Sequence, residues 1–272
     1  MPEGDTIYRT AARLRPVLQD TVIETAHSRD QVLAADSLNG LMVTSVEARG
    51  KHLLMHVSDG RCIHSHMGMH GSWHLYQRDE PWRKPERLSA LVLETAAHSV
   101  VCFNPKLLEV LTRDGLKRHR WLSRLGPDLL AGTLDESEVL RRFRTQTAVA
   151  IGEALLNQSV VCGIGNVFKS EVLFLTATHP TTPVTRLDDQ QVLKIVREAQ
   201  RLMLRNLDSH PRRTRFGPGR QPHWVYARAG EPCLRCDTRI KITRQGDLGR
   251  TTYWCPDCQP PAADQALIQS SP

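Results

Sequence analysis

Residues 41–66 read LMVTSVEARGKHLLMHVSDGRCIHSH, and this stretch decides the fold class of the N-terminal part. It contains three runs rich in branched apolar residues, at 41–48, 52–57 and 61–66. The turn signals Arg49-Gly50 and Asp59-Gly60 separate them. Two further runs of the same kind follow at 90–95 and 99–103. Short strands joined by short turns predict an antiparallel β-sandwich or barrel over about 20–104.

Helical periodicity flanks these strands on both sides. Residues 5–18 carry one apolar stripe, with Asp5 as a candidate N-cap. Beyond the strands, four segments have apolar residues at helical spacing, at 135–144, 148–157, 166–175 and 187–206. Asp188 and Asp189 open the last of them, where negative charge favours a helix. The sequence therefore predicts an α+β protein, with a sandwich followed by a helical region.

A low-hydrophobicity stretch, LGPDLLAGTLDESEV at 125–139, marks the expected boundary between the two regions. We expect a β-sandwich domain over 1–125, a helical domain over 126–222 and a four-cysteine element over 223–260. An arginine-, proline- and glycine-rich loop at 211–222 precedes the cysteines. The polar, Pro/Ala-rich segment 261–272 is predicted to be a flexible tail.

The composition excludes several classes of protein. Of the 272 residues, 40% are hydrophobic and 24% are charged, which is typical of a folded chain. No stretch approaches the roughly 18 apolar residues of a membrane span, and the acidic N-terminus does not resemble a signal peptide, so we expect a cytosolic protein. The net charge is +7, and both halves share the excess. This balance favours a polyanionic partner that touches both halves, although many basic proteins bind no nucleic acid.

Four of the seven cysteines form the clearest chemical signal. Cys233-Leu-Arg-Cys236 is followed, after 18 residues, by Cys255-Pro-Asp-Cys258. Two such CxxC pairs are typical of a tetrahedral thiolate site for one structural Zn²⁺, with a β-hairpin between them; two disulfides or four unrelated thiols are the alternatives. The hairpin carries Arg239, Lys241, Arg244 and Arg250 against the single acid Asp247. These cations either contact phosphates or form a solvated strand face.

The N-terminus offers a second chemical signal. Pro2 follows Met1, and a small second residue normally allows removal of the methionine. A secondary amine just before a helix feels the positive end of the helix dipole, which disfavours its ammonium form. Such an amine can attack an aldehyde-like carbon and form a cationic iminium, and Glu3 beside it could move protons. An incidental N-terminal proline is the plainer interpretation of these residues alone.

Five motifs occur together and in a fixed order along the chain. They are MPEGD at 1–5, RGKHLL at 49–54, HSHMGMHGSW at 64–73, CGIGNVFKSEVLF at 162–174, and the four-cysteine hairpin. This combination resembles the Fpg/Nei family of bifunctional DNA glycosylases and AP lyases. The likeness runs from Pro2 to Cys258, nearly the whole chain.

The resemblance implies a fold and a mechanism. The fold is an N-terminal antiparallel β-sandwich with flanking helices, a helical domain with a helix–two-turn–helix element, and a zinc-finger β-hairpin, with double-stranded DNA in the cleft between the halves. A damaged nucleotide is flipped out of the duplex. Pro2 is then the Schiff-base nucleophile and Glu3 the proton donor and acceptor, and β- and δ-elimination cut the strand.

The resemblance also assigns residues that hold DNA. Lys51 would contact phosphate and donate a proton for β-elimination; alone, it would be a solvated lysine at a strand end. Asn166 would bind phosphate at a helix N-terminus, or serve as an ordinary N-cap. Arg250 would grip phosphates and donate a proton for δ-elimination. Met69 would fill the gap left by the flipped base, or be a core methionine.

Histidines 64, 66, 70 and 74 could suggest a second metal site. Their spacing is expected to spread them over different faces, and no carboxylate lies near them in the sequence. We therefore interpret them as structural histidines.

Two departures from the Fpg pattern favour the Nei branch, which acts on oxidised pyrimidines. Leu107 and Leu108 stand where Fpg-type chains carry an Arg–Phe pair, and the segment 208–222 is shorter than their loop before the finger. MGMHG at 67–71 is more like Fpg, and Thr6 stands where many members have a second glutamate. The alternatives are an Fpg-type enzyme for oxidised purines, an inactive zinc-ribbon DNA-binding protein, and a zinc-stabilised protein-interaction module. A monomer is expected.

Overall fold

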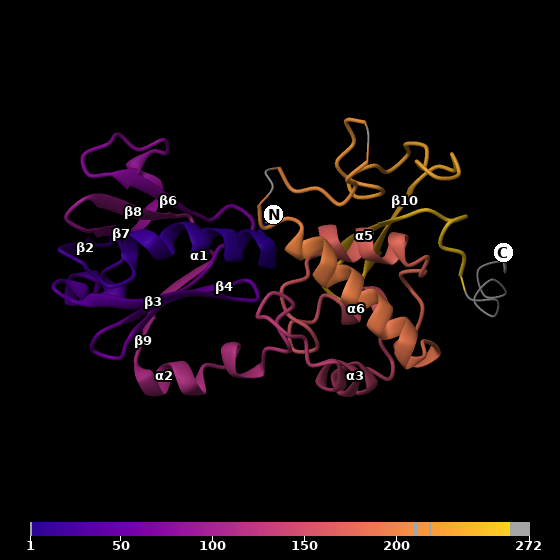
Figure 1. Ribbon diagram of the computed structural model, residues 1–272, viewed down its shortest axis with the longest axis horizontal. Helices are drawn as coiled ribbons and strands as arrows, with labels where there is room; N and C mark the ends of the chain where they lie inside the picture. The colour runs from indigo at the N-terminus through magenta and orange to yellow at the C-terminus, as the bar shows by residue number, and fades with distance from the viewer. Residues whose placement is uncertain (1, 209–210, 218, 262–272) are drawn as a thin grey trace. The chain divides into compact units, whose positions relative to one another are not determined.

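The computed structural model describes residues 2–208, 211–217 and 219–261. The chain divides into two compact units, residues 1–124 and 125–272 (Figure 1). The predicted tail lies, apart from Pro261, outside the described residues. Within the described part of the chain, no helix is long and apolar enough to cross a membrane.

Two antiparallel sheets build the first unit. The larger has the order β1-β3-β4-β5-β9, with β1 (Thr21–Val22), β3 (Met42–Arg49), β4 (His52–Val57), β5 (Cys62–His66) and β9 (Leu107–Leu111). The smaller has the order β2-β7-β8-β6, with β2 (Thr25–His27), β7 (Ser89–Glu94), β8 (His98–Phe103) and β6 (Ser72–Gln77). The five strands predicted from the apolar runs are all present.

The core of this unit lies between the two sheets and the first helix, α1 (Gly4–Leu18). Because side chains alternate along a strand, one face of β4 contributes Leu53, Met55 and Val57 to the core. The smaller sheet contributes residues such as Leu91 and Leu93 to the same cluster. The stripe of α1 packs there too, with Ile7, Ala11, Leu14 and Leu18 buried. The predicted sandwich is confirmed.

Short helical segments complete the first unit. They are η1 (Gln31–Leu33), η2 (Ala35–Leu38), η3 (Glu86–Leu88), α2 (Arg113–Arg118) and η4 (Leu122–Arg124). Thr112 is the N-cap of α2, and its hydroxyl accepts a 3.0 Å hydrogen bond from the Gly115 amide. It follows directly on β9 and packs against that strand, so the 113–124 segment stays close to the larger sheet.

The second unit is mainly helical. Its helices are α3 (Glu136–Arg144), α4 (Ile151–Ala154), α5 (Asn166–Leu175), η5 (Val184–Arg186) and α6 (Asp189–Leu204). Three of them match the predicted segments closely, and Asp188 begins α6 in a capping box with Gln191. The helix predicted over 148–157 is wrong in length. The Asn157 side chain accepts the Ser159 amide at 3.0 Å and so favours a turn over further helix.

A two-stranded antiparallel hairpin follows the helices, with β10 (Lys241–Gln245) and β11 (Arg250–Trp254). Gln245 pairs with Arg250, so residues 246–249 form the loop. Gly246 and Gly249 have φ values of 65° and 55°, in the left-handed region that glycine adopts readily. Both strands and the loop were predicted from the sequence.

Candidate functional site

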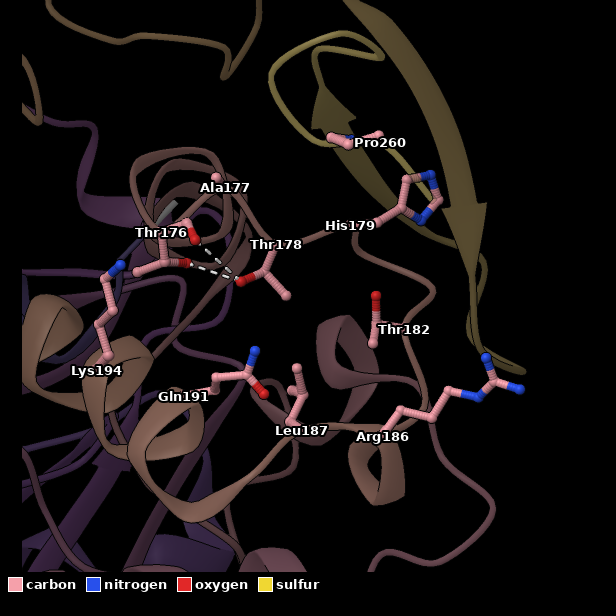
Figure 2. Close-up of a pocket in the computed structure, with 10 residues that line it drawn as sticks. All are labelled: Thr176, Ala177, Thr178, His179, Thr182, Arg186, Leu187, Gln191, Lys194 and Pro260. Carbon is pink, nitrogen blue, oxygen red and sulfur yellow. Dashed lines mark hydrogen bonds between the residues drawn. The ribbon is translucent and has the colours of Figure 1, made fainter. Parts of the chain in front are cut away.

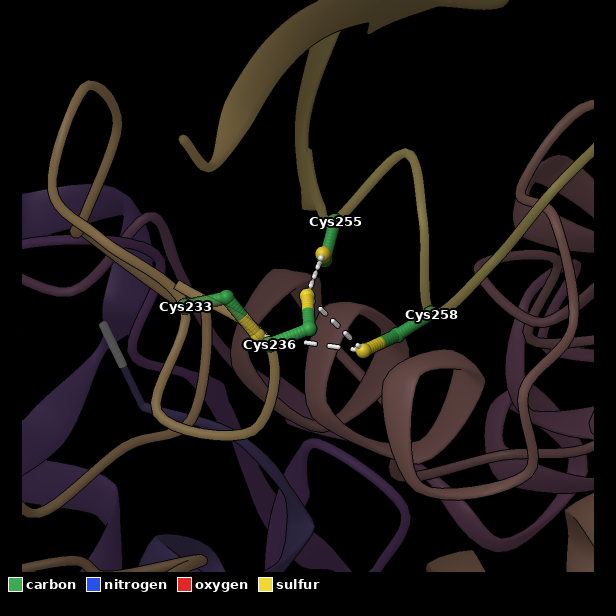
Figure 3. Close-up of side chains that lie close together, drawn as sticks. All are labelled: Cys233, Cys236, Cys255 and Cys258. Atoms are coloured by element: carbon green, nitrogen blue, oxygen red, sulfur yellow. Dashed lines mark hydrogen bonds between the residues drawn. The ribbon is translucent and has the colours of Figure 1, made fainter. Parts of the chain in front are cut away.

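The four clustered cysteines converge from the two ends of the β10–β11 hairpin (Figure 3). The Sγ atoms of Cys236 lie 3.4 Å from Cys255 and 3.5 Å from Cys258, and Cys233 lies 3.8 Å from Cys258. A tetrahedral zinc with Zn–S bonds of about 2.3 Å requires sulfur separations near about 3.8 Å. A disulfide requires about 2.05 Å, so the distances fit zinc and exclude disulfides among these four. One structural Zn²⁺ is therefore confirmed as the cofactor that this cluster fits.

The surroundings of the sulfurs also suit a metal. The Arg235 amide donates to Cys233 Sγ at 3.4 Å. A hydrogen bond from Thr238 lowers the pKa of Cys236 to about 7, whereas burial raises the pKa of Cys255. Zinc binding would thus displace a proton from the Cys255 thiol. The scattered cysteines differ, because burial raises the pKa of Cys62 to about 12 and this thiol belongs to neither group of candidate metal ligands among the described residues.

The predicted nucleophile and proton-transfer residue sit at the start of α1. Glu3 is the N-cap residue of this helix, and its carbonyl accepts the Thr6 amide at 2.9 Å and the Ile7 amide at 3.2 Å. The prediction of Asp5 as the N-cap is wrong, because Asp5 lies inside the first helical turn. The Glu3 side chain is fully buried, and Pro2 before it is half-buried. Once Met1 is removed, the Pro2 amine would lie at the positive end of the α1 dipole, beside a desolvated carboxyl group. The helix start thus supplies the placement that the sequence predicted.

Lys51 lies in the two-residue turn between β3 and β4. Arg49 and His52 form the last pair of the ladder, so only Gly50 and Lys51 are left in the turn. Gly50 has a φ of 57°, which suits glycine at the first central position of a tight hairpin turn. Lys51 is half-buried. The Arg-Gly-Lys motif is therefore a hairpin tip, and its short loop restricts where the lysine can point.

Met69 lies at the tip of the short loop between β5 and β6. Its side chain is 64% exposed, so the alternative of a core methionine is wrong. The loop is closed by the Gly71 amide, which donates to the Met67 carbonyl at 2.9 Å. A Cβ at Gly71 would lie 2.4 Å from that carbonyl oxygen, so only glycine fits there. The motif builds a rigid loop that holds one apolar side chain out in solvent.

A buried histidine network lies on the outer face of the larger sheet. His52 Nδ1 lies 2.8 Å from His64 Nε2, and His64 Nδ1 lies 2.8 Å from Glu109 Oε1. His52 also packs its ring against His66, with ring centroids 5.0 Å apart. The expectation that the histidines spread over different faces is wrong for His64 and His66, because residues two apart share a face of a strand. The carboxylate comes from β9, where Glu109 pairs with His64.

The hydrogen bonds of this network argue against a metal at His64, Glu109 and His119. The Leu122 amide donates to His119 Nδ1 at 3.2 Å, so the proton of His119 is on Nε2. That Nε2–H points at Glu109 Oε1, 2.9 Å away, and offers no lone pair to a metal. Burial lowers the pKa of His52 to about 3, which keeps its ring neutral. The interpretation of His64 as a structural histidine agrees with these bonds.

The GIGN segment forms the turn that starts α5. Gly163 has a φ of 102°, and its amide donates to Gln158 Oε1 at 3.1 Å, while Gln158 Nε2 donates to the Ile164 carbonyl at 3.1 Å. Gln158 thus holds the turn from both sides, a role that sequence reasoning missed. Gly165 is the N-cap residue and Asn166 is the first helical residue, so the interpretation of Asn166 as an ordinary N-cap is wrong. The buried Asn166 begins a ten-residue helix, the expected place for a phosphate contact.

Arg250 is the exposed first residue of β11, immediately after the hairpin loop. Sequence reasoning missed what supports the chain leading to this hairpin. Glu171 of α5 is fully buried and accepts the amides of Trp224, Val225 and Tyr226 at 2.8, 2.8 and 2.7 Å. It also accepts a hydrogen bond from Thr214 Oγ1. The Glu171 carboxylate therefore attaches residues 224–226, which lead to the zinc-binding cysteines, to α5.

The predicted site residues are divided between the two units. Pro2, Glu3, Lys51 and Met69 belong to the first, while Asn166, Arg250 and the four zinc ligands belong to the second. The structure brings the four sulfur atoms together and places Glu3 next to Pro2. A pocket of the second unit, lined by residues including Thr178, His179, Arg186 and Lys194, contains none of these residues (Figure 2).

Three family descriptions match this chain. Residues 1–106 match the N-terminal domain of formamidopyrimidine-DNA glycosylase, residues 125–216 its H2TH domain, and residues 230–261 the zinc finger found in FPG and IleRS. The chain belongs to the Fpg/Nei family. Among its relatives, the "Probable endonuclease 8 2" of Streptomyces coelicolor is 38% identical over 262 residues, which cover 95% of this chain and 94% of the relative. The "DNA-(apurinic or apyrimidinic site) lyase Nei2" of Mycolicibacterium smegmatis is 38% identical and covers 95% and 99%.

Solved structures support the fold of this Fpg/Nei member. The Fpg of Lactococcus lactis, bound to DNA with an AP site, superposes with a TM-score of 0.80 at 22% identity, over 95% of this chain and all of that one. The fold class, the family and the enzyme class predicted from the sequence, a bifunctional DNA glycosylase and AP lyase, are confirmed.

Proposed function

We propose that this chain excises oxidised pyrimidines from double-stranded DNA in base-excision repair and cuts the strand at the resulting abasic site. The observation that carries the proposal is the buried Glu3 carboxyl at the N-cap of α1, directly after Pro2, in a chain whose relatives carry endonuclease 8 and AP lyase names. A secondary amine beside a desolvated carboxyl at a helix N-terminus suits formation and breakdown of an iminium.

In the proposed reaction, the Pro2 nitrogen attacks C1′ of the flipped nucleotide and the bond from C1′ to the base breaks. Glu3 protonates the ring oxygen as the sugar opens, which leaves an iminium between Pro2 and C1′. The iminium accepts electrons, so loss of a C2′ proton expels the 3′ phosphate, and a second elimination expels the 5′ phosphate. The displaced base leaves with the electron pair of its bond to C1′ and takes up a proton, and hydrolysis of the final iminium frees Pro2. No oxidant or reductant is needed, because every step is a substitution, an elimination or a hydrolysis.

The other predicted residues would hold the strand during these steps. Lys51 at the hairpin tip would contact a phosphate and protonate the leaving group of β-elimination. Arg250 would do the same for δ-elimination, and Asn166 would bind phosphate at the start of α5. Met69, held out in solvent by a rigid loop, would occupy the space of the flipped base. Both units would thus act on one DNA, which the positive charge of both halves supports.

The preference for pyrimidines rests on Leu107 and Leu108 at the start of β9, on the shortness of 208–222, and on the endonuclease 8 names of the relatives. The second candidate function is excision of oxidised purines, and the MGMHG loop at 67–71 favours it. An inactive DNA-binding scaffold is the third.

We also propose that the protein is a cytosolic monomer. Sedimentation of the purified chain would test its oligomeric state.

Single-turnover cleavage of three matched duplexes tests the proposed function. The duplexes carry one dihydrouracil, one 8-oxoguanine or one abasic site at the same position. We expect cleavage of the dihydrouracil and abasic duplexes, with 8-oxoguanine slower by at least about tenfold. Faster cleavage of 8-oxoguanine would assign the chain to the purine branch. Absence of cleavage on all three, with zinc bound and Met1 shown to be removed, would support the inactive scaffold.

A further inference from the structure

Three successive polar residues in the middle of α5 are fully buried. Lys169, Ser170 and Glu171 each have 0% exposure, in a helix that begins with the proposed phosphate-binding Asn166. Burying an ammonium group is costly unless hydrogen bonds replace its water. The hydrogen bonds of Lys169 therefore identify the groups that replace water around its ammonium.

Lys169 binds the zinc-finger hairpin. Its Nζ donates to the Thr251 carbonyl at 3.0 Å and to Thr252 Oγ1 at 2.7 Å. The Thr252 hydroxyl donates in turn to Gln245 Oε1 at 2.5 Å, and Gln245 Nε2 donates to the Pro180 carbonyl at 2.9 Å. Thr252 and Gln245 are both buried. This chain of bonds connects α5 to both strands of the hairpin.

These hydrogen bonds involve the residues on either side of Arg250 in the hairpin, its cross-strand partner and its successor in the sequence. Gln245 is its cross-strand partner, and Thr251 is the residue that follows it. The Arg250 side chain itself is exposed. Lys169 lies one helical turn after Asn166, so the buried network joins the helix start to the strand start within one unit. The two proposed phosphate-binding residues are therefore joined by a network whose side chains, Lys169, Thr252 and Gln245, are buried.

We propose that Lys169 is a positioning residue for Arg250. Its ammonium holds the start of β11 in place, so that Arg250 and Asn166 present one preorganised phosphate grip. The inference rests on the proposed role of Arg250 as a phosphate contact. Lys169 is fully buried and so does not itself present its charge to phosphate, and its hydrogen bonds to Thr251 and Thr252 lead to the hairpin.

The salt dependence of binding to an abasic duplex tests this role. Lys169→Met removes the ammonium, whereas Thr252→Val breaks the same network without changing the charge, and Thr252→Ser is the matched control that keeps the hydroxyl. We expect Lys169→Met and Thr252→Val each to reduce the slope of log K against log salt by about 1, as Arg250→Ala does. In the Arg250→Ala background neither should reduce the slope further, and Thr252→Ser should match the wild type. Additive losses would overturn the proposal, because they would show that Lys169 does not act through Arg250.

Amide hydrogen exchange of the DNA-free protein separates this proposal from the proposed function. With one zinc per chain retained, Lys169→Met and Thr252→Val should speed exchange at residues 250–253 by at least about tenfold, a sign of local opening. Unchanged exchange would refute the positioning role whatever the DNA data show. Faster exchange in a protein that binds no abasic duplex in its wild-type form would support the network and refute the proposed function.

Discussion

The two sets of proposed site residues are held in place in different ways. In the first unit, Glu3, Lys51 and Met69 lie at a helix start, a two-residue turn and a glycine-closed loop, so each is placed by its sequence neighbours. In the second unit, Lys169 and Glu171 bind residues 43 to 83 positions away and so fix the hairpin that carries Arg250. Local geometry places the proposed chemistry, and long-range buried polar groups place the proposed phosphate grip.

Glu3→Gln should give the largest effect of the substitutions, and it tests a residue that is placed by its sequence neighbours. Loss of a general acid–base group costs about 10²–10⁴-fold in rate, and we expect a loss of that size in single-turnover base excision. Gln keeps both the capping Glu3 carbonyl and the volume of the side chain, so the thermal unfolding midpoint should change little. A rate within threefold of the wild type would contradict the role of Glu3, and a large fall in the midpoint would mean that the carboxyl is structural.

Glu171→Gln tests a buried residue that binds groups distant from it in the sequence. The carboxylate accepts three backbone amides, and an amide side chain would turn an NH₂ group toward some of those donors. We expect the second unit to lose about 2–4 kcal/mol of stability, measured by calorimetry with zinc bound. Glu198→Gln, which breaks only a surface pair with Arg201, is the control and should cost less than about 0.5 kcal/mol. Equal losses of stability for the two substitutions would contradict the role of Glu171 in holding distant segments together.

Acid should destabilise the first unit through its buried histidines. Burial lowers the pKa of His52 to about 3 and that of His66 to about 4, whereas an unfolded histidine titrates near 6.5. Lys51 faces both rings, and Lys106 faces His66, which opposes their protonation further. As the pH falls below 6.5, the unfolded chain binds protons that the folded unit refuses, so stability decreases. At pH 5 the buried His52 should account for a loss of about 2 kcal/mol and the partly exposed His66 for less, and the loss should level off near pH 3–4.

Urea unfolding of the first unit between pH 7 and 4 measures this loss. His52→Gln should remove the larger part of this loss over pH 6.5–4, and His66 should account for the remainder. A profile that is already flat in the wild type would show that these rings are charged in the folded state, and would contradict the hydrogen bonds assigned to them.

Met69→Ala should have the smallest effect on stability, less than about 0.5 kcal/mol, because the side chain is 64% exposed. We expect weaker binding to a duplex with an abasic site and nearly unchanged binding to an undamaged duplex. Gly71→Ala is the contrasting variant, because its Cβ would meet the Met67 carbonyl and distort the loop. Equal weakening on both duplexes would assign Met69 to general contact rather than to insertion.

The contrast between the units also explains what the sequence could predict. The helix after Pro2, the hairpin tip at Lys51 and the spacing of the four cysteines depend on adjacent residues, so their motifs were sufficient. The cap of that helix was predicted wrongly at Asp5, because the backbone carbonyl of Glu3 accepts the first helical hydrogen bonds. β6 and β9 were missed because their residues alternate less clearly, and with them the pairing that places Glu109 beside His64. The burial of Lys169 and Glu171 could not be predicted, because nothing near them in sequence reveals the distant groups that they bind.

Borohydride trapping tests the central claim most directly. The purified protein, with Met1 shown to be absent and zinc present, is incubated with a duplex that holds one dihydrouracil and is then reduced. We predict a covalent complex whose DNA adduct maps to Pro2 by mass spectrometry, and none when the duplex is undamaged. An adduct on a lysine, or no adduct while the abasic duplex is still cleaved, would contradict an N-terminal proline as the nucleophile.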